Sequence, residues 1–410
     1  MTVTAPTRDI VGVAATRATY AAFIATGFAF SSWASRIPQV RDRLELDPSQ
    51  LGLLLLAIAA GSLIALPASG SLVARFGSRS VVAWMARINA AGLVVLGLGY
   101  QFGVWAAALG LFVFGFAQGA WDVAMNVQGA LVEQRIKRAI MPRFHAGFSV
   151  GTVAGALSGA AMVALGVSVT VHLAVVAVIV AALVPLAVRP FLADPVPAGT
   201  DEGGSDRGAT RRAWREPRTL LIGLFVLAFA FAEGTGNDWT SVALIDGYGT
   251  SALVGTLGFA AFLAAMTAGR WFGPAWLDRH GRVAVIRWMS VISLVGVLMF
   301  VFGQLTWIAL VGTVLWGFGL SLGFPVGMSA GADEPRLAAP RVSVIASIGY
   351  CAFLAGPPVV GFLGDHLTVL RGVTSVAVLL ALAIALAGHV APLTPASASE
   401  PTALQDPARR

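Results

Sequence analysis

The sequence predicts an all-α membrane protein with twelve transmembrane helices in two pseudo-symmetric six-helix bundles. Three observations predict this fold: the composition, the recurrence of long apolar segments, and residues that repeat between the two halves. Of the 410 residues, 57% are hydrophobic and only 11% are charged. A soluble protein carries about 25% charged residues. A chain with less than half that share requires an apolar solvent, and lipid provides one.

Twelve apolar segments are long enough to cross a bilayer, which takes about 20 residues. All are expected to be helices, because lipid offers no partner for unpaired backbone groups. The first six lie at 16–35, 51–73, 80–100, 104–128, 143–165 and 167–189. The second six lie at 219–245, 251–275, 283–303, 305–329, 341–364 and 369–391.

The segments define an N-terminal bundle at 16–191 and a C-terminal bundle at 218–391. Residues 192–217 between them are rich in Pro, Gly, Asp and Arg without an apolar period, which is typical of a flexible linker. The ends, 1–15 and 392–410, are polar or rich in Pro, Ala and Ser, and they are expected outside the membrane.

The basic residues predict the orientation. Four of the 27 Lys and Arg residues fall in segments placed outside, and the other 23 lie in or near alternate loops and both termini. The four are Arg36, Arg41, Arg43 and Arg371. The positive-inside rule then places both termini and the linker in the cytoplasm, with the chain in a bacterial inner membrane. The net charge of +7 is therefore a topology signal, and no nucleic-acid partner is expected.

Small residues repeat between the halves at a spacing of four, which suits close helix packing. They are Ala57, Gly61, Ala65 and Ser69 in the second segment, and Ala261, Ala265, Gly269 and Gly273 in the eighth, 204 positions later. At an offset of 206, Trp33-Ala-Ser matches Trp239-Thr-Ser. Two registers so close together predict an internal repeat. The densest row, predicted to make a tight helix contact, is Gly147, Gly151, Gly155 and Gly159.

The loops after the second and eighth segments share a further motif. One reads Gly70-Ser-Leu-Val-Ala-Arg75-Phe-Gly77-Ser-Arg79, and the other reads Gly273-Pro-Ala-Trp-Leu-Asp278-Arg279-His-Gly281-Arg282. Both resemble the loop signature of the major facilitator superfamily, G-x-x-x-D-R-x-G-R-R. With the twelve segments and the central linker, the resemblance covers nearly the whole chain.

The resemblance implies a secondary transporter that works by alternating access, with these loops acting as a conformational latch through charge contacts. The residues that carry this expectation are Arg75, Gly77, Arg79, Asp278, Arg279, Gly281 and Arg282. Ala74 stands where the family has its first aspartate, so the first latch is expected to be weakened or rearranged.

Three further stretches resemble a poorly characterised bacterial branch of this family, which includes a membrane protein associated with rhizopine, an inositol-amine. They are Trp33-Ala-Ser-Arg-Ile-Pro38, Trp121-Asp-Val-Ala-Met-Asn126 and Phe144-His-Ala-Gly-Phe-Ser149. The fifth segment lacks the Gly-Pro pair typical of drug/proton antiporters in the family.

Polar residues at helical spacing predict a water-filled cavity faced by the first, fourth and seventh segments. The residues expected in it are Ser31, Trp33, Gln118, Asp122, Asn126, His145, Asn237 and Trp239. Alternatives remain open for several of them. Asp122 is at least as well explained as a latch partner of Arg75 or Arg79, and His145 as a structural histidine. The three tryptophans suit stacking on a sugar-like ring, whereas Trp33 and Trp239 also suit anchoring at the membrane interface.

Glu233 is the strongest candidate for carrying a proton, with Asp238 beside it. It lies about 15 residues into its segment, roughly 20 Å along a helix and near mid-membrane. An ionised carboxylate there costs about 3 kcal/mol, so taking up a proton is favoured. A group that gains and releases a proton in this way suits a reversible proton carrier. The alternative is a glutamate held neutral or paired with a cation for structure. Arg87 and Arg270 lie about two turns inside their segments, where structural pairing is expected, and Arg36 is expected to be a solvated loop charge.

Several chemistries are not expected. Cys351 is the only cysteine, so no disulfide or cysteine metal site can form. The chain has no phosphate-binding loop, Walker lysine, nucleophile–base pair or metal cluster at useful spacing, so an enzyme, a cofactor or direct ATP use is not expected.

The favoured hypothesis is proton-coupled transport of a small polar organic solute, such as a sugar, polyol or metabolite. Efflux of a drug-like metabolite by proton antiport is an alternative, and a non-transporting membrane sensor or scaffold is another. The expected partners are a small-molecule substrate, protons and membrane lipid, with the chain acting as a monomer.

Overall fold

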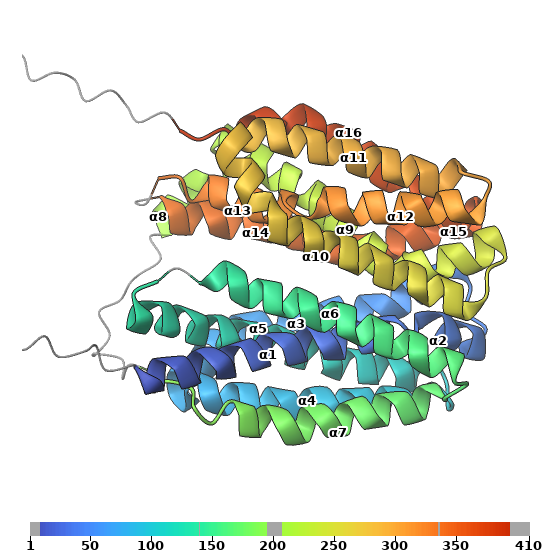
Figure 1. The fold of residues 1–410 in the computed structure, drawn as a ribbon, viewed down its shortest axis with the longest axis horizontal. Coiled ribbons are helices and arrows are strands. Elements are labelled where there is room, and N and C mark those ends of the chain that lie inside the picture. The colour runs from blue at the N-terminus through green and yellow to red at the C-terminus, as the bar shows by residue number, and fades with distance from the viewer. Residues whose placement is uncertain (1–8, 139, 195–206, 335–336, 394–410) are drawn as a thin grey trace, which may run out of the picture.

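The computed structural model describes residues 9–138, 140–194, 207–334 and 337–393. Within these ranges the chain forms helices joined by short turns, and twelve spans are long and apolar enough to cross a membrane (Figure 1). The predicted fold class, two six-helix bundles, is confirmed. Residues 1–8 and 394–410 of the predicted ends 1–15 and 392–410, and residues 195–206 of the predicted linker, lie outside the described residues.

The first bundle contains α1 (Ile10–Ala34), α2 (Ile37–Leu44), α3 (Pro48–Phe76), α4 (Ser78–Gly99), α5 (Val104–Ile136), α6 (Met141–Ala164) and α7 (Val169–Ala187). The short α8 (Arg207–Ala213) precedes the second bundle. That bundle contains α9 (Pro217–Tyr248), α10 (Ala252–His280), α11 (Arg282–Phe302), α12 (Thr306–Leu320), α13 (Gly323–Gly331), α14 (Ala338–His366), α15 (Val369–Gly372), α16 (Thr374–Leu386) and the 3₁₀ turn η1 (Ala387–Val390).

The helices differ from the predicted segments in two ways. Several are longer, such as α5, which continues to Ile136 rather than ending at 128, because a helix can extend beyond the hydrocarbon layer. The predicted segment 305–329 is broken between α12 and α13, where Ser321 ends one helix and Gly323 begins the next. The Cα of Gly323 lies so close to the ring of Phe229 that an added methyl group would sit 2.0 Å from it.

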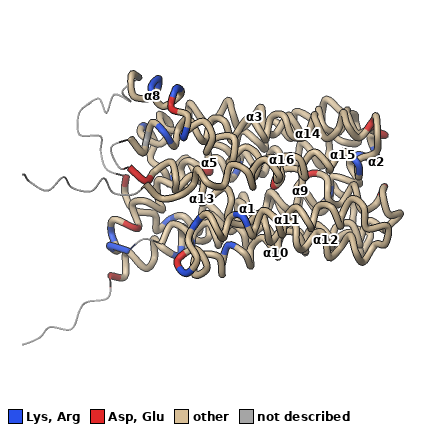
Figure 2. The backbone as a smooth tube through the Cα atoms, turned by 90° about the horizontal axis from the view of Figure 1, so that it is seen from above, with Lys and Arg blue, Asp and Glu red and all other residues tan. Residues whose placement is uncertain are grey.

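The two bundles lie side by side, with α3 against α14 and α6 against α10 across their interface. Figure 1 shows α8 and the start of α1 at one end of the molecule, and α2 and α15 at the other. We call these the terminal end and the distal end. Figure 2 shows most charged residues gathered at the terminal end.

The glycines of the two repeated loops have the same backbone conformation. Gly77 has φ 79° and ψ 149°, and Gly281, 204 positions later, has φ 77° and ψ 158°. This region of φ/ψ space is almost restricted to glycine, because a Cβ atom would clash with the backbone. Each glycine ends one helix, donates its N–H to the carbonyl four residues back, and begins the next helix. The repeat predicted from the sequence therefore holds at the level of single torsion angles.

The bundles touch closely at the distal end, where α3 and α14 run antiparallel. Pro48 lies opposite Gly361, and Pro357 lies opposite Gly52, and in each helix the glycine is four positions after the proline. A methyl group on Gly361 would lie 2.4 Å from the Pro48 carbonyl oxygen, and one on Gly52 would lie 2.5 Å from that of Pro357. We call this reciprocal contact the Pro–Gly crossing.

The start of α3 is fixed by its N-terminal residues. Asp47 and Gln50 form a capping box, in which each side chain accepts the other residue's backbone N–H, at 2.7 and 3.2 Å. Pro48 occupies the first helical position, where its missing N–H costs nothing. These interactions hold the Pro48 carbonyl where Gly361 meets it.

Polar contacts reinforce the distal closure. The Ser49 N–H donates to Asp365 on α14 at 3.2 Å, and Arg41 forms an ion pair with Asp246 on α9. Within the described residues, the hydrogen bonds between the bundles that lie nearest the terminal end are those from Thr267 and Arg270 to Ser149, at 3.5 and 3.4 Å. Ser149 is eight residues inside α6, so the bundles are joined at the distal end and at mid-depth.

We expect Gly52→Ala to separate the bundles at the distal end, because its methyl group meets backbone atoms that cannot move aside. The test places spin labels at Glu45 and Leu367, which are both exposed, in a chain with Cys351 replaced by Ser. Double electron–electron resonance should show longer distances between the labels in the Gly52→Ala variant than in the parent. Gly70→Ala on the same helix is the matched control, because its methyl group would meet no atom within 4 Å. An unchanged distance in the Gly52 variant would contradict the role given to the crossing.

Candidate functional site

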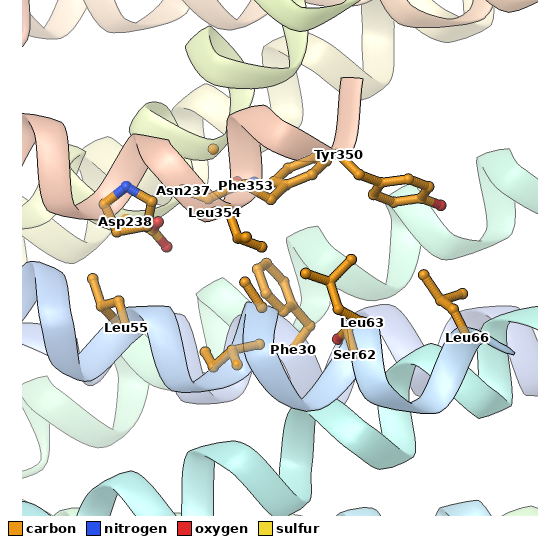
Figure 3. Close-up of a pocket in the computed structure, with 14 residues that line it drawn as sticks. Phe30, Leu55, Ser62, Leu63, Leu66, Asn237, Asp238, Tyr350, Phe353 and Leu354 are labelled. Carbon is orange, nitrogen blue, oxygen red and sulfur yellow. The ribbon is translucent and has the colours of Figure 1, made fainter. Parts of the chain in front are cut away.

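A cavity of about 190 Å³ lies between the bundles and is lined by α1, α3, α9 and α14. Figure 3 shows the labelled side chains of α1 and α3 facing those of α9 and α14 across it. Most of the lining is apolar. Three aromatic rings face the cavity, those of Phe30, Tyr350 and Phe353, and α3 contributes an aliphatic wall. The wall includes Leu55, Ile58, Leu63 and Leu66.

The polar face of the cavity comes from α9, where Gly234, Asn237 and Asp238 share one side of the helix at spacings of three and four. Asp238 is the only lining residue with a formal charge. Its carboxylate has no hydrogen-bond or ion-pair partner in the described part of the chain. The Asn237 Oδ1 atom is buried and also lacks a partner there. Ser62 on α3 donates its hydroxyl to the Gly115 carbonyl at 2.8 Å, which leaves its oxygen free to accept.

Glu233, five residues before Asp238, faces a different part of the interior, because five residues turn a helix by about 140°. Both of its carboxylate oxygens accept hydrogen bonds from the same Arg270 nitrogen at 2.9 Å. Arg270 also donates to the Ser321 carbonyl and to the Ser149 hydroxyl, both at 3.4 Å. The side chains of Arg270 and Glu233 are 20% and 19% exposed. This ion pair connects α9 and α10 to α6 of the other bundle.

The structure places two of the predicted cavity and proton-coupling residues, Asn237 and Asp238, in the cavity wall. It does not place Ser31, Trp33 or Trp239 there, because all three are buried between helices. Neither tryptophan side chain is exposed to the surroundings, as an anchor at a membrane interface would be. Glu233 lies with Arg270, which fits the alternative of a paired glutamate and the pairing expected of Arg270.

The remaining predicted residues stand apart from the cavity wall. On α5, the Asn126 amide donates to the Asp122 carbonyl at 2.9 Å and to its carboxylate at 3.3 Å. Gln118 accepts from Asn89 at 3.3 Å. The His145 ring packs edge-on against Phe23, with 5.1 Å between the ring centres. Within the described ranges, no ion pair joins Asp122 to the arginines of the first loop.

The aromatic and aliphatic residues of the cavity wall were not predicted. An apolar side chain facing a cavity has the same sequence signature as one facing lipid or another helix. The sequence feature that could have indicated Tyr350 is its hydroxyl group, which is a polar group within an apolar segment.

The model of the Major Facilitator Superfamily matches residues 19–339. The chain belongs to the major facilitator superfamily. The family predicted from the two loop motifs and the twelve segments is therefore confirmed. Members of this superfamily are transporters rather than enzymes.

Relatives within the superfamily match over most of the chain. An uncharacterized MFS-type transporter of Yersinia pestis is 32% identical over 355 residues, covering 86% of this chain and 90% of that protein. The membrane protein MosC of Rhizobium meliloti is 27% identical over 349 residues, covering 84% of this chain and 82% of that protein. MosC is the rhizopine-associated protein of the predicted branch, so that resemblance is also confirmed.

The fold matches solved structures of the superfamily. The crystal structure of a mutant of the nucleoside transporter NupG superimposes with a TM-score of 0.74, covering 93% of this chain and 98% of that one. The two sequences are only 14% identical, so the likeness is one of fold.

The superfamily loop signature has charge contacts in the second half. Arg282 donates to Asp333 at 2.6 Å and to Ser329 at 3.1 Å. Asp333 also accepts from Arg218 at 3.1 Å, so it joins the loop to the start of α9. Within the described residues, the side chains of Asp278 and Arg279 form no hydrogen bond or ion pair.

The first half, which has Ala74 in the aspartate position, is arranged differently. Asp194 accepts from the backbone N–H and the hydroxyl of Ser78 at the start of α4, at 2.8 and 3.0 Å. The Arg75 guanidinium lies over the ring of its neighbour Phe76. In the described part of the chain, the side chain of Arg79 forms no hydrogen bond or ion pair. Asp194 and α8 both fall in the predicted flexible linker 192–217, so the described parts of that segment are ordered against the bundle or helical.

The prediction that Arg36 is a solvated loop charge is wrong. The residue is only 2% exposed. Its Nε donates to His172 Nδ1 at 3.1 Å, and its terminal nitrogen donates to the Val167 carbonyl. Because His172 Nδ1 accepts, the ring carries its proton on Nε2, which faces the Ser158 hydroxyl at 3.4 Å. Arg36 thus connects the end of α1 to α7.

An ionic cluster at the terminal end joins α9 to α14. Arg341 donates to Glu216 at 2.7 Å and to Glu334 at 3.0 Å. Burial alone would raise the pKa of Glu216, but hydrogen bonds from Arg341 and Thr219 outweigh it and lower that pKa below its ordinary value. The ionised form of Glu216 therefore stabilises the fold.

The sign of this effect gives a pH prediction. A carboxyl group whose pKa is lowered by folding adds stability above its unfolded pKa of about 4.3, and loses it as the pH falls through the folded value. We expect the melting temperature of the wild type to fall more steeply below about pH 4.5 than that of Glu216→Gln. The exposed Glu45→Gln is the control and should follow the wild type. Parallel curves for all three proteins would contradict the assignment.

The ion pair between Glu233 and Arg270 gives a second prediction. Arg270→Gln leaves a carboxylate without its partner inside the protein, so it should lower the free energy of unfolding by about 3 kcal/mol. The double variant Glu233→Gln/Arg270→Gln should lose less than the sum of the single variants. Unfolding by sodium dodecyl sulfate measures both. Arg87→Gln is the control, because Arg87 is exposed and donates only to Ala83 of its own helix. Additive losses would show that the pair is not coupled.

Proposed function

We propose that this chain is a proton-coupled secondary transporter that moves a small organic solute across the inner membrane by alternating access. The observation that carries the proposal is the cavity between the bundles, in which Asp238 has no partner in the described chain. Membership of a superfamily of transporters supports it. The cavity lies within a single chain, so we propose a monomer as the functional unit.

We propose that the terminal end faces the cytoplasm, because basic residues gather there (Figure 2). Both chain ends then lie on the cytoplasmic side. In this orientation the Pro–Gly crossing and the Arg41–Asp246 ion pair close the outer side. Reopening that side requires both contacts to separate.

The cavity favours a solute with an apolar body over the sugar or polyol suggested by the sequence. Aromatic and aliphatic side chains cover most of its wall, and the polar groups are confined to a few positions. A binding site of this kind fixes orientation with its polar groups and gains most of its affinity from apolar contact. The substrate of NupG, a nucleoside, likewise combines a planar apolar base with a polar part.

The Glu233–Arg270 ion pair supplies a route for coupling to protons. Protonation of Glu233 would remove the charge that holds Arg270 against α9. Arg270 also reaches Ser149 on α6, so its release would loosen a contact between the bundles at mid-depth. A proton on α9 and the relative position of the bundles are thereby linked. We propose that the Asp333–Arg282 and Asp194–Ser78 contacts stabilise the same state at the terminal end.

The test is uptake into proteoliposomes of a solute that stabilises the purified protein in a thermal-shift screen. A membrane potential of about 100 mV supplies about 2.3 kcal/mol per proton, enough for roughly fifty-fold accumulation of a neutral solute. We expect Glu233→Gln to lose accumulation while still exchanging solute down its gradient. Glu45→Gln should accumulate solute normally.

Two results would change the proposal. Normal coupled accumulation by Glu233→Gln would remove the proton role of Glu233. A solute that binds but is never moved by the wild type would favour the non-transporting sensor or scaffold.

A further inference from the structure

The polar groups that line the cavity include several hydrogen-bond acceptors, beside two donors, the Asn237 amide nitrogen and the Tyr350 hydroxyl. Asp238 offers two carboxylate oxygens, and the Asn237 Oδ1 is buried without a donor in the described residues. The Ser62 hydroxyl gives its proton to the Gly115 carbonyl, so towards the cavity it can only accept. A solute that satisfies the Asp238 carboxylate and the Ser62 oxygen must bring N–H or O–H donors.

The charge in the cavity is also one-sided. Asp238 is acidic, and no lining residue is basic. The nearby arginine of the interior, Arg270, is held by Glu233 on another side of α9. A carboxylate that is ionised and unpaired among apolar side chains is costly, and a cation beside it lowers that cost. A neutral solute would leave that cost in place, and an anionic solute would add repulsion.

The aromatic residues add a second attraction for a cation. Phe30 faces Tyr350 and Phe353 from the opposite bundle across the cavity (Figure 3). The rings of Tyr350 and Phe353 lie 6.2 Å apart and are tilted by 47°, so they form one corner of the wall. The face of an aromatic ring attracts a cation, most strongly where water is excluded.

The size of the cavity limits the solute. The cavity has a volume of about 190 Å³. Pockets that hold drug-sized ligands are larger, at about 300–1,000 Å³. The solute is therefore compact, with room for little more than one ring or a short branched chain beside its polar group.

We propose that the cavity binds a compact organic cation, an ammonium group attached to an apolar body, with Asp238 as its counter-ion. The inference deepens the proposed transport function by naming the substrate class. It assigns Asp238 to the solute itself, whereas Glu233 remains the group paired with Arg270. The apolar body would lie against Phe30, Phe353 and the leucines of α3.

Three probes with the same phenylethyl body and different charge test the inference. They are phenethylamine, which is a cation at neutral pH, the neutral 2-phenylethanol, and the anion 3-phenylpropionate. Binding to the purified full-length chain in lipid nanodiscs is measured by calorimetry, with empty nanodiscs as the blank. We expect the cation to bind at least about tenfold more tightly than the alcohol, and the anion not to compete with it.

Asp238→Asn should remove this preference, lowering the affinity for phenethylamine at least about tenfold while leaving that for 2-phenylethanol unchanged. Retained binding of the alcohol shows that the cavity is intact. Glu45→Gln, which removes an exposed carboxylate, should keep the full preference for the cation. Asp238→Glu should restore part of it, because the charge remains on the same face of α9.

The outcomes separate this inference from the proposed function. Equal affinity for cation and alcohol, no binding of phenethylamine, or a preference that survives Asp238→Asn would each overturn the substrate class and leave transport standing. A preference that depends on Asp238, together with no flux of phenethylamine into proteoliposomes, would support the cation site and count against transport.

Discussion

Helices in a bilayer gain little from the hydrophobic effect when they meet, so this fold depends on how closely their backbones can approach. Glycine provides that approach in reciprocal pairs. Methyl groups on Gly27 and Gly151 would lie 2.2 and 2.1 Å from carbonyl oxygens of the facing helix in the α1–α6 pair. Gly61 and Gly115 repeat the arrangement between α3 and α5, at 2.2 and 2.1 Å. The same device closes the distal end between the bundles, where the partner of each glycine is a proline carbonyl.

Close backbone packing leaves few places for charge, and the interior uses them sparingly. Arg36 is held by a histidine and a carbonyl, and Arg270 by Glu233, so each of these cations has hydrogen-bond acceptors around it. Asp238 differs from both, because it faces a cavity and not another side chain. Residues that hold helices together and residues that can meet a solute are thus distinguished by whether their hydrogen bonds are already made.

The sequence predicted the features that have a periodic or local signature. Twelve apolar segments, the matching glycines at positions 77 and 281, the tight contact of Gly151, and an acidic face on α9 all follow from spacing and composition. Features that depend on which segments meet were not predictable in the same way. That Arg270 pairs with Glu233, and that Phe30 faces Tyr350, requires knowing how α9, α10, α1 and α14 are placed. Burial of Arg36 was missed for the same reason, because His172 is 136 residues away.

The Pro–Gly crossing has a kinetic consequence. The nearest atoms across it are backbone atoms, those of Pro48 and Ser49 around Gly361 and those of Pro357 and Pro358 around Gly52. Separation of the two helices also requires the hydrogen bond from the Ser49 N–H to Asp365 to break. What opposes separation between these backbone atoms is short-range dispersion, and a gap of about 0.5–1 Å already removes about a quarter to a half of it. The crossing therefore holds the two helices while they are in contact, and this part of the attraction falls quickly once they begin to separate.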